Sequence, residues 1–561
     1  MSETTTHRWL LAILVAFVFL AVASSVINPL HEATDELRHY RFVQHIIQKR
    51  ALPVQGEVGC SAQGHHPPLF YATVALATFW IDTGRDVCAT LEDNPFWAYR
   101  AWEVGRDNKN QYLHTTAEAF PWSGEALAAH LARLVNVALG TAVVYLTYLI
   151  GRAIWRERPY LALGATAFVA FNPMFAYMSG AVNNDVIAGL AGAAVTLAAV
   201  RLVRDDDGLS RGWGLALGAL FALALMSKFN LAAIALTIET AVTYVAWRKK
   251  QWRLWLEANL LIAGVTLLLA GWWFGRNVIL YGEPTGVQRL TELWGVRDPR
   301  ESWGVAIHEL PYLWTSLWGR FGYGQVPLPD GIYMALRWVV GIGLLGVALP
   351  FVRRDRRELA HIWPSVGLLL LNCLLFFAVI FNYLLISPAG PMGRFFFPAL
   401  PSLAILTFYG WSRWGTLIQR RGAEAQREEG KGLAALALVG MVGLTAVAIL
   451  GFLANAYSRP PAFAADTAVP NPINAQFDTL AVLRGYEIDP PTVQPGGFID
   501  VALYWEVVGT PPGNFLLFVH LIDNETGTIV AQRDTHPGLG HFPSSQWQPG
   551  DRFIEGVRLY L

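Results

Sequence analysis

The amino-acid sequence predicts a polytopic α-helical membrane protein that carries a β-sandwich at its C-terminal end. The chain has 561 residues, of which 54% are hydrophobic and only 15% are charged, whereas a soluble chain carries about a quarter charged residues. Many apolar runs approach the roughly 20 residues that cross a bilayer, and 22 Trp are available for membrane interfaces. Beyond residue 472, alternating runs separated by turn residues are typical of strands. This composition excludes a purely cytosolic enzyme.

Apolar runs and their flanking residues predict about eleven membrane spans. They are expected at residues 9–27, 127–150, 159–179, 186–203, 212–227, 230–247, 254–274, 331–351, 362–385, 395–412 and 433–454. Basic clusters fall on alternate connections, at residues 152–158, 201–211, 248–253, 353–357 and 420–427. The positive-inside rule therefore predicts a multi-pass protein of the cell membrane with a cytoplasmic N-terminus and an extracytoplasmic C-terminal domain. Residues 21–23 could serve as a signal-peptidase site, but we expect the first run to remain as an anchor.

Three parts are predicted along the chain. Residues 1–454 form a membrane domain with a large first outer loop at 28–125, residues 455–472 form a proline-rich linker, and residues 473–561 form the β-sandwich. The sequence stops at Leu561 inside a strand-like run, so the sandwich can be incomplete. In the outer loop, the stretch 67–81 is short for a span, and we expect a helix on the outer leaflet. The insert 82–125 has no predicted role.

The strongest polar signal, HEATDELRH, follows the first predicted span at residues 31–39. A helix starting at Asn28 would place Glu32, Asp35, Glu36 and His39 on one stripe, at positions i, i+3, i+4 and i+7. Neighbouring carboxylates raise each other's pKa, which suits a general base near neutral pH. The alternative is an interfacial helix whose acids are solvated. A divalent cation is a further alternative, but the segment has no ligand set of firm spacing.

Other polar residues gather at the predicted outer ends of the spans. The segment HHPPLFY places His65 and His66 at a helix N-terminus that could favour a phosphate, or that could be a plain proline-stopped turn. In NND, Asp185 could act in a site or simply cap the next helix. Isolated cations could snorkel to headgroups or bind phosphate together; they are Lys228, Arg276, Arg320 and Arg394.

Charge and cysteine content limit the function classes. With 42 basic and 42 acidic residues, the chain has no positive surplus for nucleic acid. Three cysteines are too few for a zinc ribbon, although Cys60 and Cys88 share the outer loop and could pair in an oxidising compartment. Glu239 lies inside a predicted span and is the main point in favour of a transporter or flippase of a lipid-linked glycan. A glycan-binding receptor is a third reading, but it leaves the acidic segment unexplained.

The order of these motifs resembles the GT-C superfamily of integral-membrane glycosyltransferases, in particular the family-39-like group of protein O-mannosyltransferases and lipid A aminoarabinose transferases. The resemblance covers roughly residues 8–454. It rests on the first span followed by DE-x-x-H at 35–39, PPL-F-Y at 67–71, NP at 172–173 with NND at 183–185, the lone Lys228, WW-x-x-RN with YGEP at 272–284, and GRFFFPALP at 393–401.

The resemblance implies a sugar donor linked to polyprenyl phosphate and a catalytic acid in the first outer loop. Asp35 would deprotonate an acceptor hydroxyl, with Glu36 as helper or substitute, and the anomeric centre would be inverted. Arg394 and Lys228 would contact the phosphate, and His66 stands where relatives often have Lys or Gln. The further candidates for substrate binding are His39, Tyr71, Asp185 and Arg276. No cofactor is expected, and the acceptor could be a lipid, a glycan or a protein.

Overall fold

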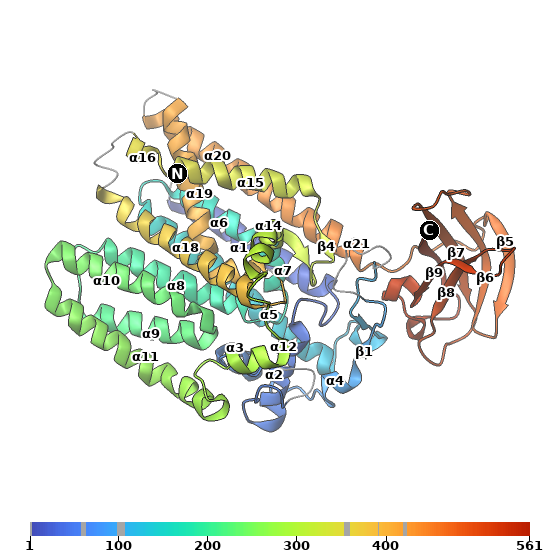
Figure 1. Ribbon diagram of the computed structural model, residues 1–561. Helices are drawn as coiled ribbons and strands as arrows, with labels where there is room; N and C mark the ends of the chain where they lie inside the picture. Colours follow the sequence, from blue (N-terminus) through green and yellow to red (C-terminus); the bar gives the residue numbers. More distant parts are fainter. Residues whose placement is uncertain (1–2, 58–62, 98–106, 353–359, 391, 419–422) are drawn as a thin grey trace.

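The computed structural model describes residues 3–57, 63–97, 107–352, 360–390, 392–418 and 423–561. Figure 1 shows a bundle of helices, a layer of short elements at one end of the bundle, and a β domain beyond that layer. The predicted fold class, a helical membrane protein with a C-terminal β-sandwich, is confirmed. Cys60 and the basic residues at 353–357 and 420–421 lie outside the described part of the chain.

The bundle is formed by the helices that correspond to the predicted spans. They are α1 (Glu3–Ile27), α5 (Gly124–Ile154), α6 (Pro159–Ala170), α7 (Pro173–Ser179), α8 (Asp185–Val203), α9 (Arg211–Ser227), η3 (Phe229–Ile234), α10 (Ala235–Lys249), α11 (Trp252–Tyr281), α15 (Asp330–Gly346), α16 (Leu349–Val352), α18 (Trp363–Ile386), η4 (Gly393–Ala399), α19 (Leu400–Ile418), α20 (Ala423–Ala446), the π-helical segment η5 (Val447–Leu453) and α21 (Ala454–Ala456).

Each predicted span has a helical counterpart, but not every counterpart is a full crossing. Within the described ranges, nine helices are long and apolar enough to cross a membrane, or ten if α6 and α7 form one span. Helix α9 is apolar but has only 17 residues. Helices α6 and α7 meet at a 63° bend, because Asn172 leaves the helical conformation, accepts a hydrogen bond from the Phe175 amide, and precedes Pro173.

Two apolar cores hold the helices together. The larger core joins α1, α6, α15, α19 and α20, with Phe17, Phe168 and Phe408 among its members. The second core lies between α8, α9, α10, α11 and α18. Small residues allow close crossings: a Cβ atom on Gly346 of α15 would meet the backbone of Gly410 in α19. Large apolar side chains remain exposed on the outside of α11, as expected for a surface that faces lipid.

Short elements cover the end of the bundle that faces the β domain (Figure 1). They come from the first outer loop and from the segment between α11 and α15. Their bounds are α2 (Glu36–Lys49), α3 (Leu69–Thr78), α4 (Val87–Thr90), β1 (Glu92–Asp93), β2 (Tyr112–Leu113), η2 (Thr116–Glu118), α12 (Val287–Trp294), α13 (Ser302–His308), α14 (Leu310–Gly319), β3 (Arg320–Phe321) and β4 (Val326–Pro327).

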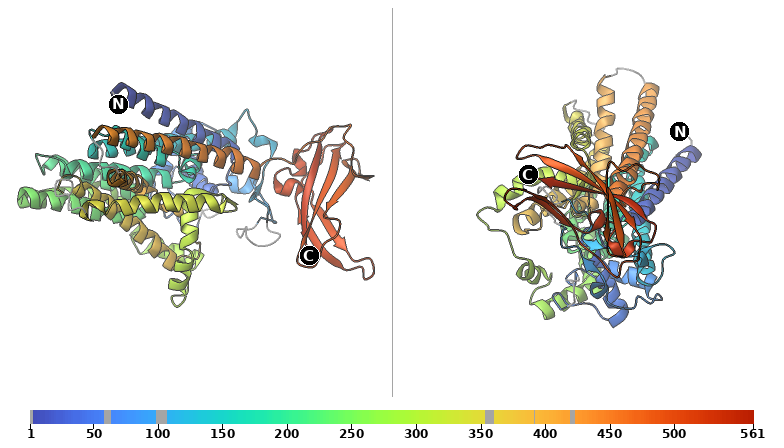
Figure 2. Two further views of the ribbon diagram at one scale, coloured as in Figure 1. Left: turned by 90° about the horizontal axis from the view of Figure 1, so that it is seen from above. Right: turned by 90° about the vertical axis from the view of Figure 1, so that its right-hand side faces the viewer.

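The C-terminal domain is a sandwich of two antiparallel sheets. The larger sheet has the order β10-β7-β6-β5, and β8 pairs with β9 in the smaller one. Trp505, Trp547 and Phe553 lie in the core between the sheets. The bounds are β5 (Asn471–Phe477), β6 (Ala481–Asp489), β7 (Phe498–Val507), β8 (Leu517–Ile522), β9 (Ile529–Thr535), η6 (Pro537–Gly540), η7 (Ser544–Gln546) and β10 (Arg552–Tyr560). Figure 2 shows this domain beyond one end of the bundle, opposite the N-terminus.

The acidic segment differs from the predicted helix. Residues 28–35 form turns, and α2 begins only at Glu36. His31 and Asp35 have φ angles of 68° and 62°, a left-handed conformation that interrupts any continuous helix. The expectation that Glu32, Asp35, Glu36 and His39 share one helical stripe is therefore wrong, and the three acids point to different partners.

Candidate functional site

The candidate site lies where the ends of four helical elements meet. Asp35 is the N-cap residue of α2, Asp185 is the first residue of α8, Lys228 follows α9, and Arg394 lies in the 3-10 helix η4. Each of these residues lies at or near the end of a helical segment, and the turns at these ends place the four side chains close together. The structure thus brings four of the predicted site residues together.

The four side chains form a continuous ion-pair cluster. Arg394 Nη2 lies 2.5 Å from Asp35 Oδ2, and Arg394 Nε lies 3.0 Å from Asp185 Oδ2. Lys228 Nζ donates to Asp185 Oδ1 at 2.5 Å. Arg38 approaches the other oxygen of Asp35 at 3.4 Å. The Arg394 guanidinium therefore bridges the carboxylates of Asp35 and Asp185, and Lys228 provides a second cation at Asp185.

Burial makes these contacts strong. The side chains of Arg394 and Asp185 are 3% and 2% exposed, whereas that of Asp35 is 15% exposed. Burial by itself would raise the pKa of Asp35, but Arg394 and Arg38 lower it below the ordinary value. Asp35 is therefore an ionised carboxylate that keeps some access to its surroundings. For Asp35 and Glu36 the expected upward shift is wrong, because burial, which would raise their pKa values, is outweighed by Arg394 and Arg38 at Asp35 and by Arg133 at Glu36.

His39 and Tyr71 form one wall of the cluster. His39 Nδ1 and the Tyr71 hydroxyl lie 2.7 Å apart, and the Tyr71 ring stacks on Phe42 at 3.8 Å. Burial lowers the pKa of His39 to about 3, so its ring is neutral. His66 stacks on His39 with ring centroids 5.8 Å apart. Burial lowers the pKa of His66, and the positive charges of Lys228 and Arg394 lower it further. The predicted residues His39, His66 and Tyr71 therefore lie against the ion-pair cluster.

A small hollow next to Arg394 has room for little more than one water molecule. Its lining includes Thr34, Tyr312, Arg320, Tyr323 and Arg394. Tyr323 connects the hollow to the acid, because the Asp35 amide donates to its hydroxyl at 3.0 Å and that hydroxyl lies 3.5 Å from Asp35 Oδ1. Sequence reasoning missed Tyr323; its only signal was the glycine-rich segment GRFGYG at 319–324.

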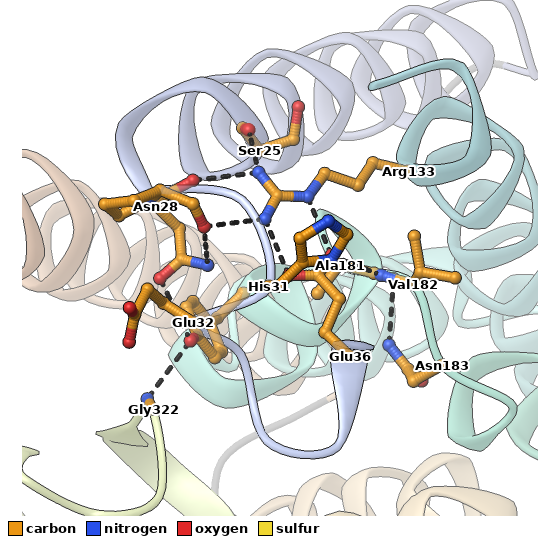
Figure 3. A network of polar contacts seen from close by, with 12 residues as sticks. Ser25, Asn28, His31, Glu32, Glu36, Arg133, Ala181, Val182, Asn183 and Gly322 are labelled. Carbon is orange, nitrogen blue, oxygen red and sulfur yellow. Dashed lines mark hydrogen bonds and ion pairs between the residues drawn. The ribbon is translucent and has the colours of Figure 1, made fainter. Parts of the chain in front are cut away.

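Glu36 does not share the cation that Asp35 contacts; its carboxylate pairs with Arg133. The Arg133 guanidinium donates to both Glu36 oxygens at 2.7 and 2.6 Å, and Glu36 also accepts from the Val182 amide at 2.8 Å. Arg133 donates in addition to the carbonyls of Ser25, Asn28 and Pro29. Figure 3 shows this network around the turn that follows α1. Sequence reasoning missed Arg133, although a charge inside a predicted span is a signal.

Glu32 holds the insert rather than the site. Its oxygens accept from the amides of Gln111 and Tyr112 at 2.8 and 2.9 Å, and His114 Nε2 lies 3.1 Å away. The other ring nitrogen of His114 lies 2.9 Å from Glu118. Cys88, also in the insert, is disulfide-bonded, while Cys373 is free. The three acids of the motif therefore serve the site, the turn and the insert separately.

Two other predicted polar residues have different surroundings. Arg276 donates to the Pro53 carbonyl at 2.9 Å and lies over the Trp273 ring at 4.9 Å. Glu239, which had no predicted partner, accepts from the Trp255 indole at 3.0 Å and from Thr243 at 2.6 Å. Within the residues that the structure describes, no group of three or more His, Cys, Asp or Glu side chains is placed to hold a metal ion.

One part of the chain matches a known family. The family model of dolichyl-phosphate-mannose-protein mannosyltransferases matches residues 101–285, which is less than half of the chain. A search of curated proteins finds no match. Among solved structures, ArnT from Cupriavidus metallidurans bound to undecaprenyl phosphate has 16% identity and a TM-score of 0.45, with 81% of this chain and 77% of that chain covered.

Two further solved structures are similar at lower identity. The apo oligosaccharyltransferase of Archaeoglobus fulgidus has 13% identity and a TM-score of 0.42, with 79% of this chain and 56% of that chain covered. Arabinosyltransferase EmbB from Mycobacterium smegmatis has 11% identity and a TM-score of 0.39, with 98% and 62% covered. The helical fold and the family match together define a multi-pass membrane protein that resembles the GT-C glycosyltransferases, as predicted from the motifs.

Proposed function

We propose that this protein transfers a sugar from a polyprenyl-phosphate donor to an acceptor hydroxyl on the extracytoplasmic side of the cell membrane. The observation that carries the proposal is the single cluster in which an ionised, partly accessible carboxylate, Asp35, pairs with Arg394, and Asp185 links Arg394 to a second cation, Lys228. Transfer from such a donor needs both kinds of group within a few ångströms: a proton acceptor for the incoming hydroxyl and cations for the departing phosphate.

The chemistry assigns one role to each part of the cluster. Asp35 accepts the proton of the acceptor hydroxyl as its oxygen attacks the anomeric carbon of the donor. The bond between that carbon and the phosphate oxygen breaks, and the polyprenyl phosphate leaves with the electron pair. Arg394 and Lys228 stabilise its negative charge, in partial exchange for their contacts with Asp35 and Asp185. Attack opposite to the leaving phosphate inverts the anomeric centre, as the resemblance implies.

Neighbouring groups support this arrangement. A neutral His39 adds no charge beside Asp35, and its bond to Tyr71 fixes the wall of the site. The hollow lined by Tyr312, Arg320 and Tyr323 has room for a water-sized polar group next to Arg394. Both carboxylate oxygens of Glu36 are held by Arg133, so we assign Glu36 to the support of the turn that carries Asp35.

Transport of a lipid-linked glycan is the second candidate, and it would depend on Glu239. Its carboxylate is half-buried and bonded between α10 and α11, which is a local tie between two helices. We therefore favour transfer.

Reconstituted protein distinguishes the two functions. Proteoliposomes are supplied with radiolabelled polyprenyl-phosphate sugars and a panel of lipid, glycan and peptide acceptors, and both product and vesicle-side distribution of the donor are measured. We expect Asp35→Asn to abolish transfer and Glu239→Gln to leave it within about threefold of the wild type. Donor movement that is lost in Glu239→Gln, without any transfer in the wild type, would contradict the proposal.

A further inference from the structure

The insert at 82–125 contacts both the β domain and the segments next to the candidate site. Its segment 107–114 runs between them, and the layer that contains β1 and α4 lies on the side of the bundle that faces the β domain (Figure 1). Successive side chains of this segment engage opposite partners. Asn108 and Asn110 bond to the β domain, whereas Lys109 bonds to the membrane domain.

On the side of the β domain, the contacts are polar and specific. Asp107 forms an ion pair with Arg533 of β9. Asn110 donates to the Gly540 carbonyl at 3.2 Å, and Gln546 donates to the His114 carbonyl at 2.6 Å. Two further pairs, Asn514 with Glu92 at 2.7 Å and Thr535 with Asn108 at 3.1 Å, complete the surface. Strand β9, the turns after it and Asn514, which precedes β8, therefore form a docking surface for the insert.

On the opposite side, the same segment leads to Asp35. Lys109 Nζ donates to the Gln325 carbonyl at 3.0 Å, and Gln325 Nε2 donates back to the Lys109 carbonyl at 3.1 Å. Gln325 Oε1 accepts from the Tyr323 amide at 2.7 Å. Tyr323 in turn accepts a hydrogen bond from the Asp35 amide. Two residues, Gln325 and Tyr323, thus connect Lys109 of the segment to the acid.

A second path runs through Glu32 in the turn that ends at Asp35. The amides of Gln111 and Tyr112 and the ring of His114 all bind its carboxylate, which is fully buried. Asp35 has a left-handed φ of 62°, a conformation that a non-glycine residue keeps only when its surroundings hold it. The insert supplies two of those supports, one through Tyr323 and one through Glu32.

We propose that the β domain is a positioning element of the transferase: by docking on segment 107–114 it holds Tyr323 and the 32–35 turn, and thereby Asp35, in the reactive geometry. This inference rests on the proposed function. Arg533, Thr535 and Gln546 are positioning residues that act through the insert, since their partners lie there and not at Asp35. The docked arrangement is the productive one.

The test uses the full chain in lipid nanodiscs and reverses the charge of the interface pair. Arg533→Glu and Asp107→Arg each place like charges together, and the double variant restores an opposite pair. We expect each single variant to lower kcat at least tenfold with the donor KM within about twofold, and the double variant to recover to within about threefold. Arg558→Glu is the matched control, because Arg558 pairs with Asp500 inside the β domain; we expect no change.

A covalent tether separates undocking from other damage. Glu92→Cys and Asn514→Cys, in a Cys373→Ala background, are joined with a short bismaleimide. We expect the yield of this tether to fall in Arg533→Glu, and kcat of the tethered fraction to recover. If Arg533→Glu and Asp107→Arg form the tether in the same yield as the protein with the native Arg533–Asp107 pair, the docking surface is wrongly assigned. If it fails to form while kcat stays at the wild-type value, the β domain does not position Asp35.

Hydrogen exchange tests the coupling between the β domain and the turn that carries Asp35 without requiring a transfer reaction. Undocking by Arg533→Glu is expected to raise exchange in peptides that cover residues 30–40 and 320–327, and the control Arg558→Glu is not. Unchanged exchange in both peptides, with the tether yield reduced, would overturn the inference. If the wild type shows no transfer with any donor but the expected exchange pattern is observed, the result counts against the proposed function alone.

Discussion

Asp35, which we propose as the base, owes its ionisation to its neighbours. Its burial opposes the charged form, while Arg394 and Arg38 favour it more strongly. A carboxylate with a lowered pKa stays ionised over the whole physiological range, and it accepts a proton only as the hydroxyl it contacts becomes acidic in the transition state. The same arginine therefore extends toward lower pH the range in which Asp35 is ionised and can accept a proton.

Replacing Arg394 tests this dependence through pH. Without the guanidinium, burial dominates and the pKa of Asp35 rises, so protonation begins at a higher pH. We expect the acidic limb of the kcat/KM profile of Arg394→Gln to move to higher pH, together with about tenfold weaker donor binding. Transfer rates between pH 4 and 8 measure both. Arg297→Gln is the control, because Arg297 pairs with Glu309, and we expect the acidic limb of its profile to stay in place. An acidic limb that does not move in Arg394→Gln would contradict the assignment.

Helix α1 and the α7 end of the broken span fix the turn that carries Asp35. Gly180, at the end of α7, allows this approach: a Cβ atom there would lie 2.6 Å from the Ala21 carbonyl and 2.9 Å from the Ser25 amide. Both are backbone atoms of α1, so the helix itself would have to move. The turn at 28–35 follows directly on α1 and would move with it.

Gly180→Ala is accordingly expected to destabilise the fold by about 1–3 kcal/mol, as overpacking does, and to lower the transfer rate. Thermal unfolding in nanodiscs measures the first effect. Gly264→Ala in α11 is the control, because nothing lies within 4 Å of its added Cβ; we expect a neutral result or a small gain from the better helix former. Equal unfolding temperatures for the two variants would show that the contact between α7 and α1 is not tight.

The insert has its own pH signature through His114. Burial would lower the pKa of this imidazole, but Glu118 and Glu32 raise it to about 10. Because the folded pKa lies above the ordinary value of 6.5, the contribution to stability is complete below about pH 6.5 and is lost as the pH rises toward 10. We expect the unfolding temperature of the wild type to fall over this window more steeply than that of His114→Gln. Parallel slopes would contradict the ion-pair assignment.

Much of the fold could be predicted from the sequence, because bilayer thickness and strand periodicity constrain short stretches of residues. Lipid requires apolar runs of span length, so each predicted span has its helix, and the runs at 498–507 and 529–535 are strands as expected. The convergence of Asp35, Asp185, Lys228 and Arg394 also agrees with the expected alternation of span ends.

The parts that could not be predicted depend on contacts between distant residues. A helical pattern was assumed across 28–39, whereas left-handed residues at His31 and Asp35 divide the three acids among separate partners. Arg133 and His114 lie 97 and 82 residues from the acids they bind, and periodicity carries no information over such separations. The role of the insert becomes visible only because segment 107–114 is bound from both sides.

Single-turnover kinetics of Asp35→Asn test the central claim most directly. Asn is well suited to the left-handed conformation of this position, so the turn should persist while the proton acceptor is lost. With donor already bound, we predict a chemical step slowed by about 10²–10⁴-fold and a donor Kd within about threefold of the wild type. A single-turnover rate equal to that of the wild type would contradict the account, because the acid that the cluster holds would then take no part in the reaction.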